Sequence, residues 1–127
     1  MYLKNMKTIP VLLVSAVLAA CSGSEKEVSF KRDVLPVLAE KCMPCHAPGG
    51  RGVKRTGLRL DSYEALMKGS DGGAMVSPGD TGKSPLSVFI HPTPDASMQM
   101  PFGGKNKLTK TEIDRVDAWI RQGAKDN

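Results

Sequence analysis

Cys42-Met43-Pro44-Cys45-His46 is the most informative segment of this 127-residue sequence, because its residue types and spacing indicate most of the protein's chemistry. Two thiols stand three positions apart, and a histidine follows the second thiol directly. This spacing is the attachment signature of c-type haem, in which each cysteine adds to one vinyl group of the porphyrin. The histidine then lies under the ring, where an imidazole nitrogen can bind iron. The sequence therefore predicts one covalently bound haem c at Cys42 and Cys45, with His46 as an iron ligand.

Other kinds of site also use two cysteines at this spacing. A zinc site needs four ligands, and the sequence has neither a second Cys-x-x-Cys pair nor a His-x-x-x-His pair. A redox disulfide of the thioredoxin type would be expected beside a strand–helix–strand pattern, which the sequence lacks. A purely structural disulfide would close a short and strained loop. The haem interpretation is therefore favoured.

The N-terminus has the parts of an export signal. Lys4 and Lys7 precede an apolar run from Ile9 to Ala20, and Cys21 follows. A basic start, a short apolar core and small residues before a break are typical of a secretory signal, and the run is too short to span a bilayer comfortably. Leu18-Ala19-Ala20-Cys21 resembles the lipobox of bacterial lipoproteins. The resemblance implies cleavage before Cys21 and lipidation of its thiol.

The haem-attachment motif and the lipobox together assign a role to each of the three cysteines. They also agree on a compartment outside the cytoplasm, because export leads there and haem attachment of this kind happens there. We expect residues 1–20 to be the signal peptide, 21–28 to be the lipidated cysteine and a polar tether, and 29–127 to be one domain. Met6 is an alternative start that opens an equally good signal. The expected location is the periplasm, anchored to a membrane by lipid. The position after Cys21 holds Ser22 and not the aspartate that is associated with inner-membrane retention. This favours the outer membrane.

Charge and composition limit the partners. The chain has 18 basic and 13 acidic residues, a net charge of +5 that falls to +3 without Lys4 and Lys7. No basic strand interleaved with aromatic residues is present, so a nucleic-acid partner is not expected. The chain has only three Phe, two Tyr and one Trp, and a buried haem would supply the large apolar centre that these aromatic residues do not. We expect a monomer whose partners are redox proteins and, through the lipid, the membrane.

The first half of the mature chain predicts one helix and one loop. Apolar residues recur at helical spacing between Ser29 and Cys42. Proline is tolerated only in the first turn of a helix, so Pro36 predicts a regular helix that begins near Asp33. A Gly-rich basic loop is expected from Ala47 to Gly57.

Three further helices are predicted from their end signals. They are expected from Asp61 to Gly69, from Pro85 to about His91, and from a capping box at Thr109–Glu112 to Gly123. Residues 92–107 are expected to have no regular secondary structure. The predicted fold is all-α, with about four helices and long loops. Loops of this length are unusual in a compact domain unless they wrap a cofactor.

The order of these features resembles a small class I cytochrome c domain from about Ser29 to Lys125. A subgroup of secreted bacterial cytochrome c-like domains is closer still. The stretches that carry this resemblance are Phe30-Lys31-Arg32-Asp33-Val34-Leu35-Pro36-Val37-Leu38, Leu58-Arg59-Leu60-Asp61, Pro78-Gly79-Asp80, Met100-Pro101 and Trp119-Ile120-Arg121-Gln122-Gly123-Ala124. The resemblance implies terminal helices that pack together beside the haem, and electron transfer in place of substrate chemistry.

The sixth iron ligand decides between carrying electrons and binding small molecules. Met100 is at the position that the family uses, and Pro101 restricts it to extended backbone, which suits a ligand presented from a stiff loop. Met98 stays open as an alternative, because residues two apart share one side of an extended segment. His91 is the third candidate. The other methionines considered, Met67 and Met75, are expected to fill the core.

Together these features predict a membrane-anchored, mono-haem c-type cytochrome that carries single electrons between periplasmic redox partners and is not an enzyme. The alternative is a haem-based sensor or small peroxidase-type enzyme whose sixth iron position is open or labile. Arg51, Lys54 and Arg55 stand close together in the sequence and could steer an acidic redox partner.

Overall fold

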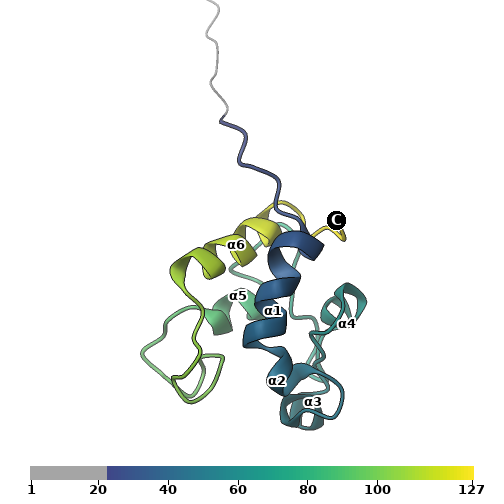
Figure 1. Ribbon diagram of the computed structural model, residues 1–127, viewed down its shortest axis with the longest axis vertical. Coiled ribbons are helices and arrows are strands. Elements are labelled where there is room, and N and C mark those ends of the chain that lie inside the picture. Colours follow the sequence, from purple (N-terminus) through teal and green to yellow (C-terminus); the bar gives the residue numbers. More distant parts are fainter. Residues whose placement is uncertain (1–22) are drawn as a thin grey trace, which may run out of the picture.

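The computed structural model describes residues 23–127, so the predicted signal peptide and Cys21 lie outside the described residues. This part of the chain is helical and has no strand (Figure 1). Its elements are the π-helical turn η1 (Phe30–Val34), α1 (Leu35–Lys41), α2 (Met43–His46), α3 (Arg51–Thr56), α4 (Tyr63–Lys68), α5 (Pro85–Ile90) and α6 (Lys110–Arg121). The all-α prediction is confirmed, although these residues form more helices than the four or so expected.

The regular helix α1 begins close to where it was predicted, and a π-helical turn precedes it. Ser29 caps this turn, because its hydroxyl accepts a hydrogen bond from the backbone N–H of Arg32 at 3.2 Å. Pro36 has no N–H to donate to the carbonyl of Arg32, and its ring would crowd that carbonyl in a regular helix. A wider π-turn accommodates the proline. The regular helix thus begins at Leu35, within two residues of the predicted start near Asp33, and the residues before it form a π-turn.

The segment Ala47–Gly57, predicted as a loop, contains a helix. α3 spans Arg51–Thr56, and Gly57 ends it in the left-handed conformation with φ of 70°. Gly52 is a poor helix former, and this short turn has no apolar stripe that would mark a buried face. α3 packs against α2, and such packing stabilises short helices more than intrinsic propensity does. The loop prediction is therefore wrong for these residues.

α4 begins later than predicted. Ser62, not Asp61, is its N-cap, and the Ser62 hydroxyl accepts from the backbone N–H of Ala65 at 3.1 Å. Asp61 forms an ion pair with Arg59 at 2.6 Å instead. Gly69 follows the last helical residue, as predicted.

α5 and α6 lie where their end signals predict them. Thr109 and Glu112 form the expected capping box: the Thr109 hydroxyl accepts from the Glu112 N–H, and the Glu112 carboxylate accepts from the Thr109 N–H. α6 is the longest helix of residues 23–127. None of the helices in these residues is long and apolar enough to cross a bilayer.

The two ends of the domain meet in its core, where η1 packs against α6. The ring centroid of Phe30 lies 5.4 Å from that of Trp119 and 5.3 Å from that of Tyr63. Asn127 adds polar contacts, since its carbonyl accepts from the Lys31 N–H at 2.9 Å and its Oδ1 accepts from the Phe30 N–H at 2.8 Å. These bonds satisfy N–H groups that a helix start leaves unpaired. The packing of terminal helices implied by the resemblance is present.

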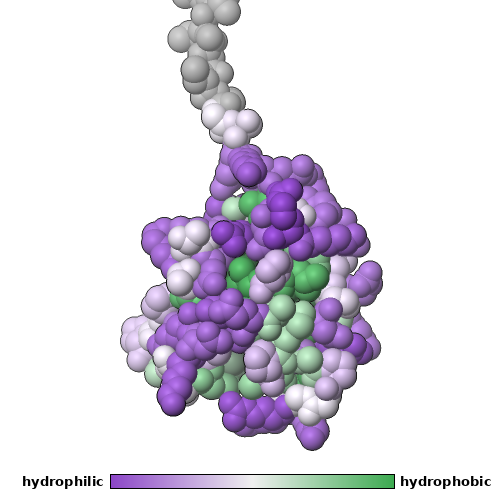
Figure 2. Space-filling view, in the orientation of Figure 1, coloured by the Kyte–Doolittle hydropathy of each residue, from purple (hydrophilic) through white to green (hydrophobic). Residues whose placement is uncertain are grey.

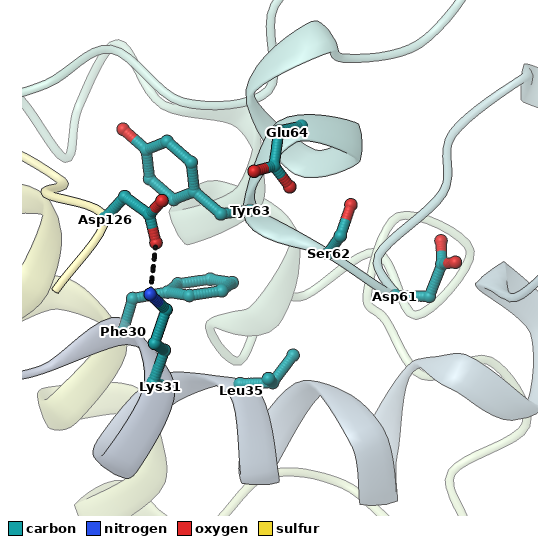
Figure 3. A pocket seen from close by; sticks show the side chains of 8 residues that line it. All are labelled: Phe30, Lys31, Leu35, Asp61, Ser62, Tyr63, Glu64 and Asp126. Atoms are coloured by element: carbon teal, nitrogen blue, oxygen red, sulfur yellow. Dashed lines mark ion pairs between the residues drawn. The ribbon is translucent and has the colours of Figure 1, made fainter.

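A small hollow of ≈ 210 Å³ lies between η1 and the start of α4 (Figure 3). Phe30 and Leu35 supply its apolar side, and an ion pair of 3.6 Å joins Lys31 to Asp126 at its rim. No residue from Cys42 to His46 lines this hollow. It is therefore separate from the cysteine–histidine motif.

Candidate functional site

The cysteine–histidine motif forms one helical turn, called the attachment turn below (Cys42–His46). Cys42 ends α1 by donating its N–H to the Leu38 carbonyl at 2.9 Å, and the His46 N–H returns to the Cys42 carbonyl at 2.9 Å. The turn thus presents both sulfurs and the imidazole within about one turn of backbone. Both cysteines are free thiols in this structure, so neither is used in a disulfide.

The imidazole of His46 is fixed by a backbone carbonyl. Nδ1 lies 2.9 Å from the carbonyl oxygen of Leu58. A carbonyl only accepts hydrogen bonds, so Nδ1 carries the hydrogen and Nε2 keeps the lone pair. This is the arrangement found behind metal-binding histidines, where the second nitrogen's partner sets the tautomer and the ring orientation. His46 is therefore prepared to bind iron through Nε2.

The segment that follows α3 holds the attachment turn from one side. Besides the Leu58 carbonyl, the Leu60 N–H donates to the carbonyl of His46 at 2.8 Å. Leu58 and Leu60 are both buried, while Arg59 between them faces outward and pairs with Asp61. This alternation places two main-chain groups on His46. It gives a physical reason for the Leu-Arg-Leu-Asp stretch seen in the sequence.

Two glycines allow α3 to approach the attachment turn closely. A Cβ at Gly52 would stand 2.6 Å from Cε1 of His46, and a Cβ at Gly50 would stand 2.3 Å from the carbonyl oxygen of Cys45. Both separations are far below van der Waals contact, so any side chain at these positions would displace the turn or the helix. Gly50 and Gly52 are therefore part of the site, because they let the backbone of α3 lie against the imidazole ring.

The state of Cys42 argues against a reactive dithiol. Burial, together with the neighbouring Cys45, raises the pKa of the Cys42 thiol to about 12. A redox-active Cys-x-x-Cys pair needs the opposite, a thiol whose pKa is lowered toward neutrality. Residues 23–127 contain no group of three or more His, Cys, Asp and Glu side chains that could hold a metal ion.

The three candidates for the sixth ligand lie in different surroundings. Met100 is partly buried, and its N–H donates to the carbonyl of Phe89 in α5 at 2.7 Å. Met98 is 49 % exposed. His91 is bound elsewhere, since its Nε2 lies 2.7 Å from a carboxylate oxygen of Asp117. A carboxylate accepts, so this nitrogen donates and is not free for iron. These surroundings favour Met100.

The methionines expected in the core lie there. Met75 is buried, and Met67 is partly buried against the same hydrophobic cluster. The Met75 carbonyl also accepts from the Leu86 N–H at the start of α5.

Two contacts attach the loop of residues 92–107, called the ligand loop below, to the rest of the domain. Asn106 has a positive φ of 58°, and its side-chain amide bridges two groups at the end of α1. Its Oδ1 accepts from Lys41 Nζ at 3.0 Å, and its Nδ2 donates to the Glu40 carbonyl at 3.2 Å. Lys41 directly precedes Cys42. The ligand loop is thereby fastened beside the attachment turn at one end and, through the Met100–Phe89 bond, to α5.

Asp117 joins α6 to α5. Its carboxylate accepts from the Ser87 hydroxyl at 2.7 Å through Oδ1 and from His91 through Oδ2. Asp117 and Ser87 are buried. Both bonds lie next to Phe89, whose carbonyl holds Met100, so the pair of helices and the ligand loop form one connected unit.

Replacing Asp117 by alanine should lower the free energy of unfolding of the haem-loaded protein by roughly 1.5–3 kcal/mol, since it leaves the buried Ser87 hydroxyl without its charged partner. Denaturant titration followed by circular dichroism measures the change. Asp114 on the same helix is the matched control. It is exposed, and within residues 23–127 it pairs only with Lys110, so Asp114→Ala should cost less than about 0.5 kcal/mol. Equal losses in the two variants would contradict a structural role for Asp117.

Sequence reasoning found the attachment turn but missed the residues that hold it. Leu58 and Phe89 both act through their backbone carbonyls, so the identity of their side chains does not reveal their roles. Asn106 acts through a bridge to residues far away in the chain. The glycines Gly50 and Gly52 were visible, and their spacing after His46 was the one available sign of close backbone approach.

The residues present suit a haem c. Two thiols and an imidazole share one turn, the imidazole already has the tautomer that leaves Nε2 for iron, and a partly buried methionine lies in a loop attached beside that turn. Imidazole and thioether are donors that haem iron accepts.

The sequence of this region is similar to a known protein family. Residues 42–101 match a family model described as Planctomycete cytochrome C. The match begins at the first cysteine of the attachment turn and ends at Pro101, directly after Met100. No curated protein and no solved structure matched the chain. The chain carries a cytochrome c-like domain with a covalently bound haem c, for which Cys42, Cys45 and His46 form the Cys-x-x-Cys-His motif.

Proposed function

We propose that this protein is a lipid-anchored, mono-haem cytochrome that carries single electrons between redox partners in the periplasm, with His46 and Met100 as the axial iron ligands. The observation that carries the proposal is the hydrogen bond from His46 Nδ1 to the Leu58 carbonyl. It presents Nε2 of an oriented imidazole beside two free thiols, which is a site for a haem c and for no other cofactor considered above.

When bound, the haem iron supplies reversible one-electron chemistry. The chain's own residues tune that chemistry. The Leu58 carbonyl makes the imidazole a more basic ligand through its hydrogen bond with Nδ1. The Phe89 carbonyl holds the backbone of Met100, so that the thioether is offered from a constrained segment. With His46 and Met100 both bound to the iron, no position would remain for an exogenous ligand, which suits an electron carrier.

The behaviour of the purified haem-loaded protein toward carbon monoxide tests this function. A carrier with both axial positions filled should be reduced and reoxidised reversibly in electrochemical titration, with a visible spectrum that carbon monoxide does not change. A rapid spectral change on adding carbon monoxide to the reduced protein would favour the alternative, a haem-based sensor or a small peroxidase-type enzyme.

The membrane anchor is supported by the lipobox-like stretch before Cys21 and by the polar residues that follow it. Stable anchoring requires more than one acyl chain, because a single chain binds membranes only marginally, and lipoprotein processing supplies several. The absence of aspartate after Cys21 favours the outer membrane.

Cys21→Ser should leave the haem domain intact but remove it from the membrane fraction, or block signal processing. Cell fractionation with a haem stain measures this. The control is Ser22→Ala, which leaves the lipidated residue in place and should fractionate like the parent. If Cys21→Ser is processed and fractionates like the parent, the lipid anchor is wrong.

A further inference from the structure

α3 presents three cations on one face. Arg51, Lys54 and Arg55 are spaced at i, i+3 and i+4, which places them on the same side of a helix. All three are exposed, and none forms an ion pair within residues 23–127. Asp71 is an acidic residue near α3, but it lies beyond the end of the helix. Its N–H donates to the Thr56 carbonyl, and its carboxylate lies against Gly57. The three residues are called the cationic face below.

The backbone of α3 adjoins the iron ligand. α3 packs against α2, and at Gly52 its backbone approaches the imidazole ring of His46 so closely that no Cβ would fit. An α-helix with its side chains is about 10 Å across. A protein docked on the cationic face would therefore lie within about one helix diameter of His46.

The opposite end of the domain differs in charge and in its connections. Its cations are largely neutralised in ion pairs, namely Lys31–Asp126, Arg32–Asp33, Arg121–Glu25 and Lys125–Glu27. Two of these pairs hold the tether against the end of α6, and the Gln122 side chain adds bonds to Lys26 and Val28. Figure 1 shows the tether leaving the body at this end, with α2 and α3 at the other, and Figure 2 shows hydrophilic residues gathered where the tether joins.

We propose that the cationic face of α3 is the docking surface for an acidic redox protein, which exchanges one electron with the haem through the His46 side of the domain. This rests on the proposed function as an electron carrier. Opposite charges steer encounter and fix orientation, and unpaired cations beside an iron ligand serve that purpose. The step moves one electron between the partner and the haem iron; the donor is oxidised and the iron reduced, and no bond forms or breaks.

The tether favours a protein over a membrane as the occupant. Glu25 is held at the far end of the domain by Arg121, and only residues 22–24 separate it from Cys21. Four peptide links reach at most about 14 Å. A lipid on Cys21 would thus keep the η1 and α6 end near the membrane and turn the cationic face toward the aqueous side.

The test uses the haem-loaded protein and reduced plant-type [2Fe–2S] ferredoxin, an acidic protein whose low potential makes electron transfer to a c-type haem favourable. The variant Arg51→Glu/Lys54→Glu/Arg55→Glu should lower the second-order rate constant at low ionic strength by about tenfold or more, and the parent's rate should fall as salt is added. The control variant Lys26→Glu/Lys31→Glu/Lys125→Glu changes the net charge equally at the opposite end and should stay within about twofold of the parent.

Reduction potentials of all three proteins are measured in parallel, so that a changed driving force is recognised. Equal slowing by the two triple variants would overturn the proposal, because it would reflect net charge alone, and no slowing in either would overturn it too. A last measurement tests binding of the Cys21→Ser protein to phosphatidylglycerol vesicles. If the α3 triple variant alone loses this binding but keeps the parent's rate with ferredoxin, the cationic face binds a membrane, and the proposal is overturned. Failure of the proposed function would instead appear as carbon monoxide binding in the parent.

Discussion

Replacing Cys42 and Cys45 together by serine should abolish covalent haem completely. Each thioether bond needs one of these sulfurs, and serine oxygen does not form an equivalent bond to the vinyl carbon under the same conditions. Mass spectrometry of the parent, expressed with haem-attachment machinery, should show the polypeptide plus one haem. The double variant should show the bare polypeptide, and its band on a denaturing gel should not stain for haem.

The remaining cysteine provides the control for this result. Cys21→Ser removes a thiol but leaves the attachment turn unchanged, so this variant should keep one haem. Single replacements of Cys42 or Cys45 leave one sulfur and should give a haem bound by a single thioether with a shifted spectrum, or a strongly reduced yield. Covalent haem in the double variant, or a parent without haem where a control cytochrome matures, would contradict the attachment site.

Features that depend on neighbours in the sequence were predictable. The attachment turn, the capping box at Thr109 and the proline at the start of α5 are all local signals, because the residues that form each of them lie within a few positions of each other. The helical character of the chain follows from such signals summed along its length. The packing of the terminal helices was implied by the family resemblance, and Phe30 and Trp119 carry it.

Features that depend on distant backbone groups were not predictable. The carbonyl of Leu58 orients His46, but every residue has a carbonyl, so its role leaves no trace in the side chain. α3 lacks an apolar stripe, and its position depends on two glycines that fit against the attachment turn. The bridge from Asn106 to Lys41 spans 65 positions. In each case the tertiary structure supplies the information.

The sequence already favoured Met100 as the sixth ligand, with Met98 and His91 as alternatives, and the tertiary structure adds to that preference. Met98 and Met100 share one side of an extended segment, and His91 is a candidate by residue type. The half-exposed side chain of Met98 and the bond from His91 to Asp117 distinguish them from Met100. Asp117 is 26 positions from His91, so nothing local to the histidine shows that its Nε2 is occupied.

Met100→Ala should change the haem-loaded protein more than any other substitution in the ligand loop. A sulfur–iron bond gives the oxidised protein a weak near-red absorption band, which this variant should lose. The reduction potential should fall by on the order of 100 mV, well within the roughly 0.8 V that axial ligation spans, because a thioether favours the reduced iron. The opened position should bind carbon monoxide or cyanide readily.

Two neighbouring variants make this prediction specific to one residue. Met98→Ala removes an exposed thioether two positions away, and His91→Ala removes the imidazole bound to Asp117; both should keep the near-red band and stay closed to carbon monoxide, and His91→Ala should lose some stability. Loss of the band in Met98→Ala would move the ligand two residues earlier in the loop. A parent without the band, unchanged by any of the three substitutions, would indicate an open or bis-histidine iron and favour the sensor or peroxidase function. Because the Phe89 carbonyl holds the backbone of residue 100 and not its side chain, Met100→Ala should keep the loop in place, so its spectrum reports the lost iron–sulfur bond and not a misfolded loop.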